Sequence, residues 1–182
     1  AKKSGIFDAA RGRYQNLVLE SRSVAVTSKY FTSLVVSKAV LDADLIVNLP
    51  KFKTHGLCIY TGAVKNMFGM LVGAEKARIH AAGVTPERFG EALVDVFAVR
   101  PPELSLIDGV DAMEGNGPAD GKIRHVGLLG LSRDPVALDA VFIRLMGIDP
   151  AKVHHVRIAS ERGHGRMRAE EMTVDGDPPK IK

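Results

Sequence analysis

The stretch DLIVNLPKFKTHG, residues 44–56, is the strongest indication of the fold class in this sequence. Its first half is an apolar run of strand length ended by Pro50, typical of a strand covered on both faces, as in a parallel sheet. Its second half places Lys51, Lys53 and His55 at every second position. If the chain stays extended after Pro50, these side chains project to one side. The stretch therefore predicts a buried strand that leads into a cluster of basic groups.

Strand-like and helix-like segments alternate along the rest of the chain. Helical patterns with N-cap residues cover 61–72, 85–100, 134–147 and 149–163, and strand patterns cover 16–20, 23–28, 103–109, 125–132 and 172–176. Residues 33–43 suit a strand or a short helix, and 73–85 form a polar connection. In the clearest helix, Thr85 is the N-cap and Pro86 takes the first helical position. The alternation predicts an α/β fold with a mainly parallel sheet flanked by helices.

Length and composition indicate one domain over residues 1–182. Apolar residues make up 46% and charged residues 25% of the chain, as is ordinary for a globular protein. The start, AKKSGIFDAARGRYQ, lacks an initiator Met and the apolar core of a signal peptide. We interpret the chain as a fragment of a longer one, with residues 1–30 as the tail of a missing N-terminal portion. No window approaches ~18 apolar residues, so we expect no membrane span and a cytoplasmic location.

Charge and cysteine content narrow the classes of ligand and partner. A net charge of +4 permits an anionic ligand or partner. Nucleic-acid binding is disfavoured because dense Lys/Arg stripes are missing, aromatic residues make up only 5% and Trp is absent. The single cysteine, Cys58, excludes an all-Cys zinc or iron–sulfur site within this chain. An inert Cys58 is favoured over a nucleophile acting with His55, and no histidine pair has zinc-ligand spacing.

The end of the first strand predicts an anion site. Ligands of open α/β sheets bind beyond the carboxyl ends of the strands, where the three basic groups lie. Thr61 and Gly62 follow as the start of a helix, whose exposed N–H groups favour an anion, and Lys65 lies one turn further on the same face. Together these groups could hold a phosphate or carboxylate. The alternative is that the lysines are solvated loop charges and His55 a turn residue.

A second strand end carries carboxylates. Asp108, Asp111 and Glu114 fall within seven residues after an apolar strand, where they could bind a divalent cation or act as general acid and base. Gly115 and Gly117 allow close approach of the backbone to a ligand. The alternative is a hydrophilic turn capped by Asp108, and for Asp111 that alternative is favoured.

Asp139 lies in a helix, PVALDAVFIRLMG, that is apolar almost all round. Burying a lone carboxylate is costly, so a buried Asp139 needs a partner. A lysine of the basic cluster would serve and would tie the two strand ends together. The alternative is that Asp139 lies on an exposed stripe of its helix or pairs locally.

Four stretches together resemble a known family. VNLPKFKTHGLCIYTGAVKNMFG, KARIH, IDGVDAMEGNGPADG and DPVALDAVFIRLMGIDP are similar to the bacterial and archaeal family called domain of unknown function 362, over about residues 40–165. Many relatives carry a ferredoxin-like iron–sulfur segment and a further N-terminal α/β portion. The resemblance therefore implies an iron–sulfur domain or electron-transfer partner outside this chain. Its motif positions are Lys51, Lys53, Thr54, His55, Thr61, Gly62, Lys65, Asn66, Lys76, His80, Asp108, Gly109, Glu114, Gly115, Gly117 and Asp139.

These observations lead to two functional hypotheses. The first is an enzyme domain, of unknown reaction and cofactor, that binds a small anionic ligand between the segments near residues 53 and 110. His55, Asp108 and Glu114 would be catalytic, with His55 as proton donor, and the ligand would be held by Lys51, Lys53, Thr61, Gly62, Lys65, Asn66, Gly115 and Gly117. The second is a non-catalytic docking module whose basic patch meets an electron-transfer or assembly partner.

Overall fold

A computed structural model describes residues 5–176 and shows an α/β fold, as the sequence predicts. Its main sheet is mixed and five-stranded, built from β3 (Val47–Asn48), β4 (Lys51–His55), β5 (Ile59–Thr61), β6 (Leu104–Glu114) and β7 (Lys122–Ser132). Strands β3 and β4 both run parallel to β6, while β5 and β7 are antiparallel to their neighbours. A separate antiparallel hairpin consists of β1 (Ser21–Ala25) and β2 (Ser33–Ser37).

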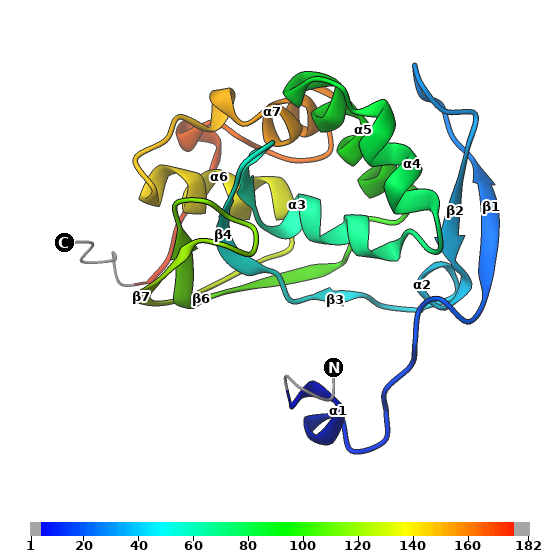
Figure 1. Cartoon of the computed structure of the whole chain (residues 1–182). Helices are drawn as coiled ribbons and strands as arrows, with labels where there is room; N and C mark the ends of the chain where they lie inside the picture. The colour runs from blue at the N-terminus through cyan, green and yellow to red at the C-terminus, as the bar shows by residue number, and fades with distance from the viewer. Residues whose placement is uncertain (1–4, 177–182) are drawn as a thin grey trace.

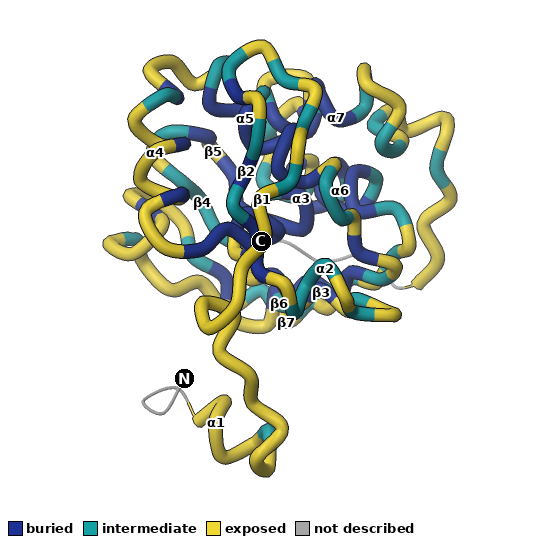
Figure 2. Tube along the Cα trace, turned by 90° about the vertical axis from the view of Figure 1, so that its right-hand side faces the viewer, coloured by how far each residue is buried: buried dark blue, intermediate teal, exposed yellow. Residues whose placement is uncertain are grey.

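One face of the sheet is covered by helices (Figure 1). The covering layer consists of α3 (Ala63–Asn66), continued by a 3₁₀ turn over Met67–Met70, α4 (Glu75–Ala82), α5 (Pro86–Val99), α6 (Pro135–Leu145) and α7 (His154–Glu161). Shorter elements are α1 (Ile6–Ala9), α2 (Lys38–Leu41) and 3₁₀ turns at Pro150–Lys152 and Ala169–Glu171. The buried residues gather between sheet and helices, whereas the segment with α1 is exposed (Figure 2).

Local sequence signals correctly predicted where α5 and α6 begin. The hydroxyl oxygen of Thr85 accepts the N–H of Arg88 at 3.2 Å, and the carboxylate of Asp134 accepts the N–H of Ala137 at 2.9 Å. These are the N-caps that the sequence predicts for α5 and α6. Asp149 likewise caps the turn that precedes α7.

Several element predictions were wrong. Residues 16–20 and 172–176 form no strand, and the expected polar connection over 73–85 contains the helix α4. The strands expected over 103–109 and 125–132 are longer, because β6 continues to Glu114 and β7 begins at Lys122. The long pairing of β6 with β7 overrides the turn preference of the acidic residues there. Residues 1–4 of the predicted N-terminal tail lie outside the described residues.

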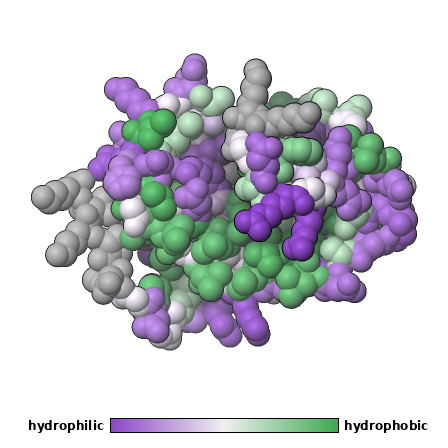
Figure 3. All heavy atoms as spheres, turned by 90° about the horizontal axis from the view of Figure 1, so that it is seen from below, coloured by the Kyte–Doolittle hydropathy of each residue, from purple (hydrophilic) through white to green (hydrophobic). Residues whose placement is uncertain are grey.

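The apolar run 45–49 is not buried on both faces as expected. Leu45, Val47 and Leu49 are exposed, and only Asn48 of the short β3 is buried. Cross-strand pairing places Val47 on the same face as Leu104, and Leu131 on that face beside Leu106. Figure 3, a view of this face, shows apolar side chains gathered across it. We call this surface the open face, since none of the helices in the described part of the chain covers it.

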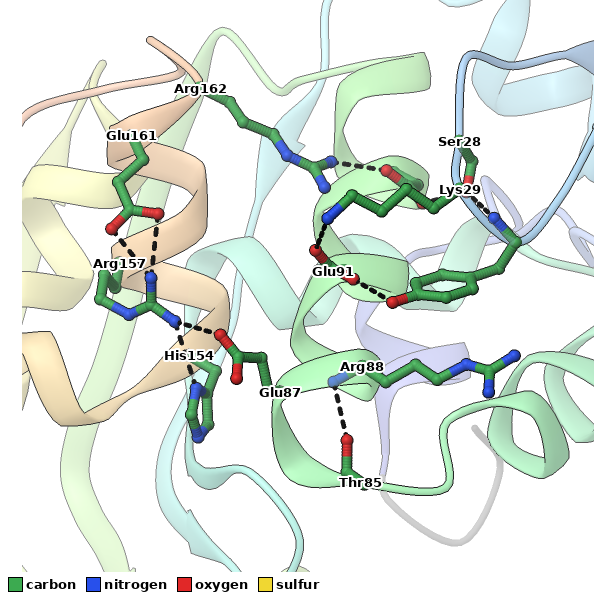
Figure 4. Close-up of polar contacts among 12 residues, drawn as sticks. Ser28, Lys29, Thr85, Glu87, Arg88, Glu91, His154, Arg157, Glu161 and Arg162 are labelled. Atoms are coloured by element: carbon green, nitrogen blue, oxygen red, sulfur yellow. Dashed lines mark hydrogen bonds and ion pairs between the residues drawn. The ribbon is translucent and has the colours of Figure 1, made fainter.

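A polar network fastens α5 to α7 and to the hairpin. Figure 4 shows Arg157 of α7 between Glu161 of its own helix and Glu87 of α5. Arg162 donates to the buried carboxylate of Asp95 at 2.6 Å. The hairpin loop joins the same helix, because Lys29 pairs with Glu91 at 2.6 Å. These contacts hold α5, α7 and the hairpin to one another.

Substitutions on the two faces of the sheet should change the free energy of unfolding by different amounts. Leu131→Lys should change the free energy of unfolding by only ~0.5 kcal/mol, since this side chain is 62% exposed on the open face. Ile107→Ala, in the neighbouring strand but fully buried against the helices, should cost about 2–5 kcal/mol. Urea unfolding of both variants measures the difference. Equal losses would mean that Leu131 is packed.

Candidate functional site

Lys51 and Asp108 lie side by side, as expected from two neighbouring strand ends. They are Cα partners in the parallel pairing of β4 with β6, and the Lys51 Nζ lies 2.8 Å from the Asp108 Oδ2. The hydrogen bond from Lys51 is the main cause that holds the pKa of Asp108 below its usual value. Both side chains are about half exposed. Lys51 therefore already has a counterion, at the open face.

Lys53 and His55 follow on β4, after a register shift between Lys51 and Lys53 in the pairing with β6. The Lys53 ammonium donates to the carbonyl oxygen of Pro118 at 3.5 Å, a long contact with the loop between β6 and β7. The Nδ1 of His55 accepts the N–H of Leu57 at 3.1 Å, so the neutral ring carries its proton on Nε2. Burial, with the charges of Lys65, His80 and Lys53, lowers the pKa of His55 to about 4. At neutral pH His55 is an uncharged hydrogen-bond donor.

Lys65 of α3 is half-buried and has no hydrogen bond or ion pair within residues 5–176. Burial, and then the charge of Lys53, lowers the pKa of its amine. Lys65 in turn lowers the pKa of His80, after burial. We call Lys53, His55, Lys65 and His80 the basic cluster. Among the groups that shift the pKa values of His55, Lys65 and His80 there is no carboxylate.

Two buried polar groups beside the basic cluster also lack partners. His155 of α7 is fully buried, and neither ring nitrogen is hydrogen-bonded to any residue that the structure describes. Burial lowers its pKa to about 3, helped by the charges of Lys65, His55 and His154. The hydroxyl of Thr61, the Cα partner of Lys53, is buried and similarly unpaired. Buried polar groups are rarely left in this state without a water or ligand nearby.

The start of α3 is already bound to an anion of the protein itself. The Asp139 Oδ1 accepts the N–H of Ala63 at 2.6 Å and the hydroxyl of Tyr60 at 2.9 Å, and the Oδ2 accepts the N–H of Val64 at 2.9 Å. Burial raises the pKa of Asp139 to about 7, against the effect of these hydrogen bonds. Asp139 is fully buried, so the exposed alternative was wrong. The lysine partner was wrong too, because backbone N–H groups and a tyrosine take that role.

Gly62 and Gly117 are required by close contacts within the protein. A Cβ at Gly62 would overlap the Tyr60 hydroxyl and the Asp139 carboxylate, and one at Gly117 would overlap the carbonyl oxygen of Thr54. Gly115 has a φ of +79°, which favours glycine. Asn66 likewise has a structural contact, since its amide donates to the Asn48 side chain at 2.7 Å. The contacts of these residues are with the protein, and their ligand roles stay predictions.

The carboxylates of the second strand end have side-chain partners of their own. Asp111 lies 2.8 Å from the His125 ring, and Glu114 pairs with Arg124 at 2.8 Å. Glu114 lies at a pocket of about 350 Å³, which is mainly apolar and is lined by Phe52, Thr54, Ala112, Met113, Glu114, Arg124, Val126, Leu145, Met146 and Ile148. The structure thus brings the segments near residues 53 and 110 together, but the carboxylates pair outside the basic cluster.

Two residues gained importance only in the structure. The sequence assigned no role to His155, which is adjacent to His154 and so lacks zinc-ligand spacing, and Asn48 was part of an apolar run. The apolar Val156, Ile158 and Ala159 around His155 are a signal that could have shown its burial. Cys58, also buried, has a pKa raised by burial to about 12, which fits the inert interpretation.

Residues 5–176 contain no group of three or more His, Cys, Asp or Glu side chains placed to hold a metal ion. None of the helices described there is long and apolar enough to cross a bilayer.

Comparison with known proteins agrees with the resemblance seen in the motifs. The model of the family described as domain of unknown function (DUF362) matches residues 1–144. The chain belongs to this family. It is also 42% identical over 157 residues to a relative named thylakoid-associated protein sll1697, from Synechocystis sp.. That match covers 86% of this chain and 49% of the relative, so the DUF362 chain spans about half the relative's length.

Asp139→Leu should lower the free energy of unfolding by about 3 kcal/mol or more. It would leave two backbone N–H groups and one hydroxyl buried without an acceptor, at about 1–3 kcal/mol each. Tyr60→Phe is the matched control, because it removes one of the three hydrogen bonds and should cost about 1 kcal/mol. Urea denaturation measures both. Equal, small losses would show that the carboxylate does not hold α3.

His155→Phe should reduce the sensitivity of the protein to acid. The unfolded chain protonates His155 near pH 6.5, whereas the folded protein resists until about pH 3. Between these values the unfolded state binds more protons, so the stability of the natural protein falls as pH falls. The variant should lose less stability between pH 7.5 and 5 than the natural protein in urea titrations. An identical loss would contradict a buried neutral imidazole.

Proposed function

We propose that this DUF362 chain binds a small anion bearing a phosphate or carboxylate group at the basic cluster. The observation that carries the proposal is the half-buried Lys65 side chain, whose amine has no partner in residues 5–176 and lies near Lys53, His55 and His80. Burying a cation is costly unless it is paired. A bound anion would supply the missing counterion for Lys65 and a hydrogen-bond acceptor for His55.

The members of the cluster would contribute differently to binding. Lys65 would provide a charge on a half-buried side chain, and Lys53 would exchange its long contact with Pro118 for the ligand. His55 would donate from Nε2, because its Nδ1 is held by the backbone. The start of α3, where Asp139 already accepts the N–H groups, would not take part.

Backbone strain beside His55 supports a binding role for this region. Ile59, the Cα partner of His55, has a φ of +68°. This conformation is rare for a β-branched residue and costs of order 1–3 kcal/mol. Strain of this kind concentrates at binding and active sites.

An enzymatic role is a further step of the proposal. Asp108 and Glu114 could act as acid or base only if a ligand displaced Lys51 and Arg124 from them. A divalent cation could enter with the anion and share these carboxylates. A cytoplasmic location and a redox link through an iron–sulfur partner stay predictions.

The second candidate function, docking of a protein partner, is favoured by the open face. Monomeric proteins rarely leave large contiguous apolar patches exposed, and Leu49, Leu129 and Leu131 are each more than 60% exposed. Such a face fits an assembly partner better than the basic patch does. Its partner could carry the electron-transfer function expected of relatives.

Phosphate should raise the pKa of His55 from about 4, because a bound anion stabilises the protonated ring. By linkage, phosphate affinity should increase as pH falls towards that value. NMR titration of the His55 ring with and without phosphate measures the shift.

Lys65→Met should weaken phosphate binding at least tenfold in calorimetry, whereas Lys152→Met, at an exposed lysine, should leave it unchanged. If phosphate altered neither the His55 ring nor the calorimetric signal, the anion site would be refuted.

A further inference from the structure

The mainly apolar pocket of about 350 Å³ beside Glu114 lies outside the proposed anion site, since its described lining includes no residue of the basic cluster. It is placed at the end of α6, which stops at Leu145 while β6 and β7 extend further. Thr54 and Glu114, which line it, lie at or next to the carboxyl ends of the parallel strands β4 and β6, where ligands of α/β sheets bind. Pockets of ~300–1,000 Å³ with mostly apolar walls are typical small-molecule sites.

Irregular strand pairing shapes the sheet side of this pocket. At a bulge between β6 and β7, Val126 and Gly127 lie opposite the single residue Val110, and Gly127 has a φ of +72°. The pairing of β4 with β6 shifts register over the same part of β6. Bulges of this kind redirect side chains and are frequent beside active sites. Ala112, which has a small side chain, lines the pocket at this level of the sheet.

Two walls of the pocket are held in place by the protein itself. The ring of Phe52 packs edge-on against Phe142 of α6, with 5.0 Å between the ring centroids. Ile148 is folded back by the motif that ends α6, because its N–H donates to the carbonyl oxygen of Ile143 at 3.2 Å and Gly147 before it has a φ of +73°. Walls that are already in place lower the cost of ordering on binding.

The polar groups that line the pocket are few and have partners. The charged residues of its described lining, Glu114 and Arg124, form an ion pair at 2.8 Å and are each about half exposed. The hydroxyl of Thr54 donates to the Met113 carbonyl oxygen at 3.5 Å, a long contact that a ligand could replace. A charged ligand would have to displace one member of the ion pair or be buried without a partner, which is costly. The pocket therefore favours an uncharged ligand.

We propose that this pocket binds a small, uncharged and mainly apolar molecule, with one hydrogen-bonding group directed at the Thr54 hydroxyl. Removal of apolar surface from water would drive the binding. Met113 and Met146, which line the pocket, have flexible side chains that adapt to the shape of a ligand. The inference adds a second site to the proposed function and stands without the anion site.

N-phenyl-1-naphthylamine, an uncharged probe whose fluorescence rises in apolar surroundings, tests the site by titration of the natural protein. It should bind saturably. Its relative 8-anilinonaphthalene-1-sulfonate, which adds a sulfonate to the same rings, should displace it only at concentrations about tenfold higher or more, because burying an unpaired charge is costly. Absence of saturable binding, or displacement by the sulfonate at equal concentrations, would overturn the proposal.

Methyl NMR of the methionines locates the probe in the natural protein without any substitution. The methyl resonances of Met113 and Met146 should shift as the probe binds, whereas that of Met172, at a separate hollow of about 490 Å³ beside β7, should stay unchanged. A shift at Met172 with none at the other two methionines would place the probe elsewhere and refute the pocket.

Val126→Phe is the matched variant, because a larger side chain at this position in β7 would fill the pocket. It should weaken binding of the probe by about tenfold or more, as expected when a side chain takes the space of the ligand. Leu131→Lys, on the open face, should leave the affinity unchanged. Urea unfolding shows whether both variants fold. Loss of binding with Leu131→Lys but not with Val126→Phe would assign the probe to the open face and contradict the proposal.

Discussion

The hydrogen bonds from α3 to the Asp139 carboxylate organise the candidate site. A carboxylate from α6, a hydroxyl from β5 and two backbone N–H groups of α3 meet there, so α6 is fixed to two consecutive elements that lie far from it in sequence. The junction sets where Lys65 lies, one residue after Val64. It also explains the glycine before the helix, because any side chain at Gly62 would collide with the carboxylate. The contacts that the motif around Thr61 makes with Asp139 therefore stabilise the fold.

The same junction changes how the anion preference of this region is understood. The start of α3 does attract an anion, but Asp139 satisfies it from within the protein. What is left without a counterion is the set of side chains next to it: Lys53, His55, Lys65 and His80. Burial raises the cost of protonating His55, and Lys65 and Lys53 add to that cost. A ligand that brings negative charge would stabilise the charged lysines and lower the cost of protonating the histidines.

The sequence predicted those parts of the structure that depend on local signals. The caps at Thr85 and Asp134, the extended segment after Pro50 and the neighbourhood of residues 51 and 108 are all present. Signals that depend on distant partners were misread. The apolar run 45–49 gave no sign that one face of its strand would stay open, and no local pattern could show that Asp139 reaches the start of α3. The burial of His155 was not predicted, because its position was interpreted only in terms of metal-ligand spacing.

The pKa of the Lys65 amine is the most direct test of the proposed anion site. In that site Lys65 is a half-buried lysine whose counterion is the bound anion. Titration of its side-chain ¹³Cε or ¹⁵Nζ resonance by NMR, with and without phosphate, gives that value. Without phosphate it should lie below the 10.5 of a solvated lysine, and saturating phosphate should raise it. An ordinary value that phosphate does not change would contradict the idea.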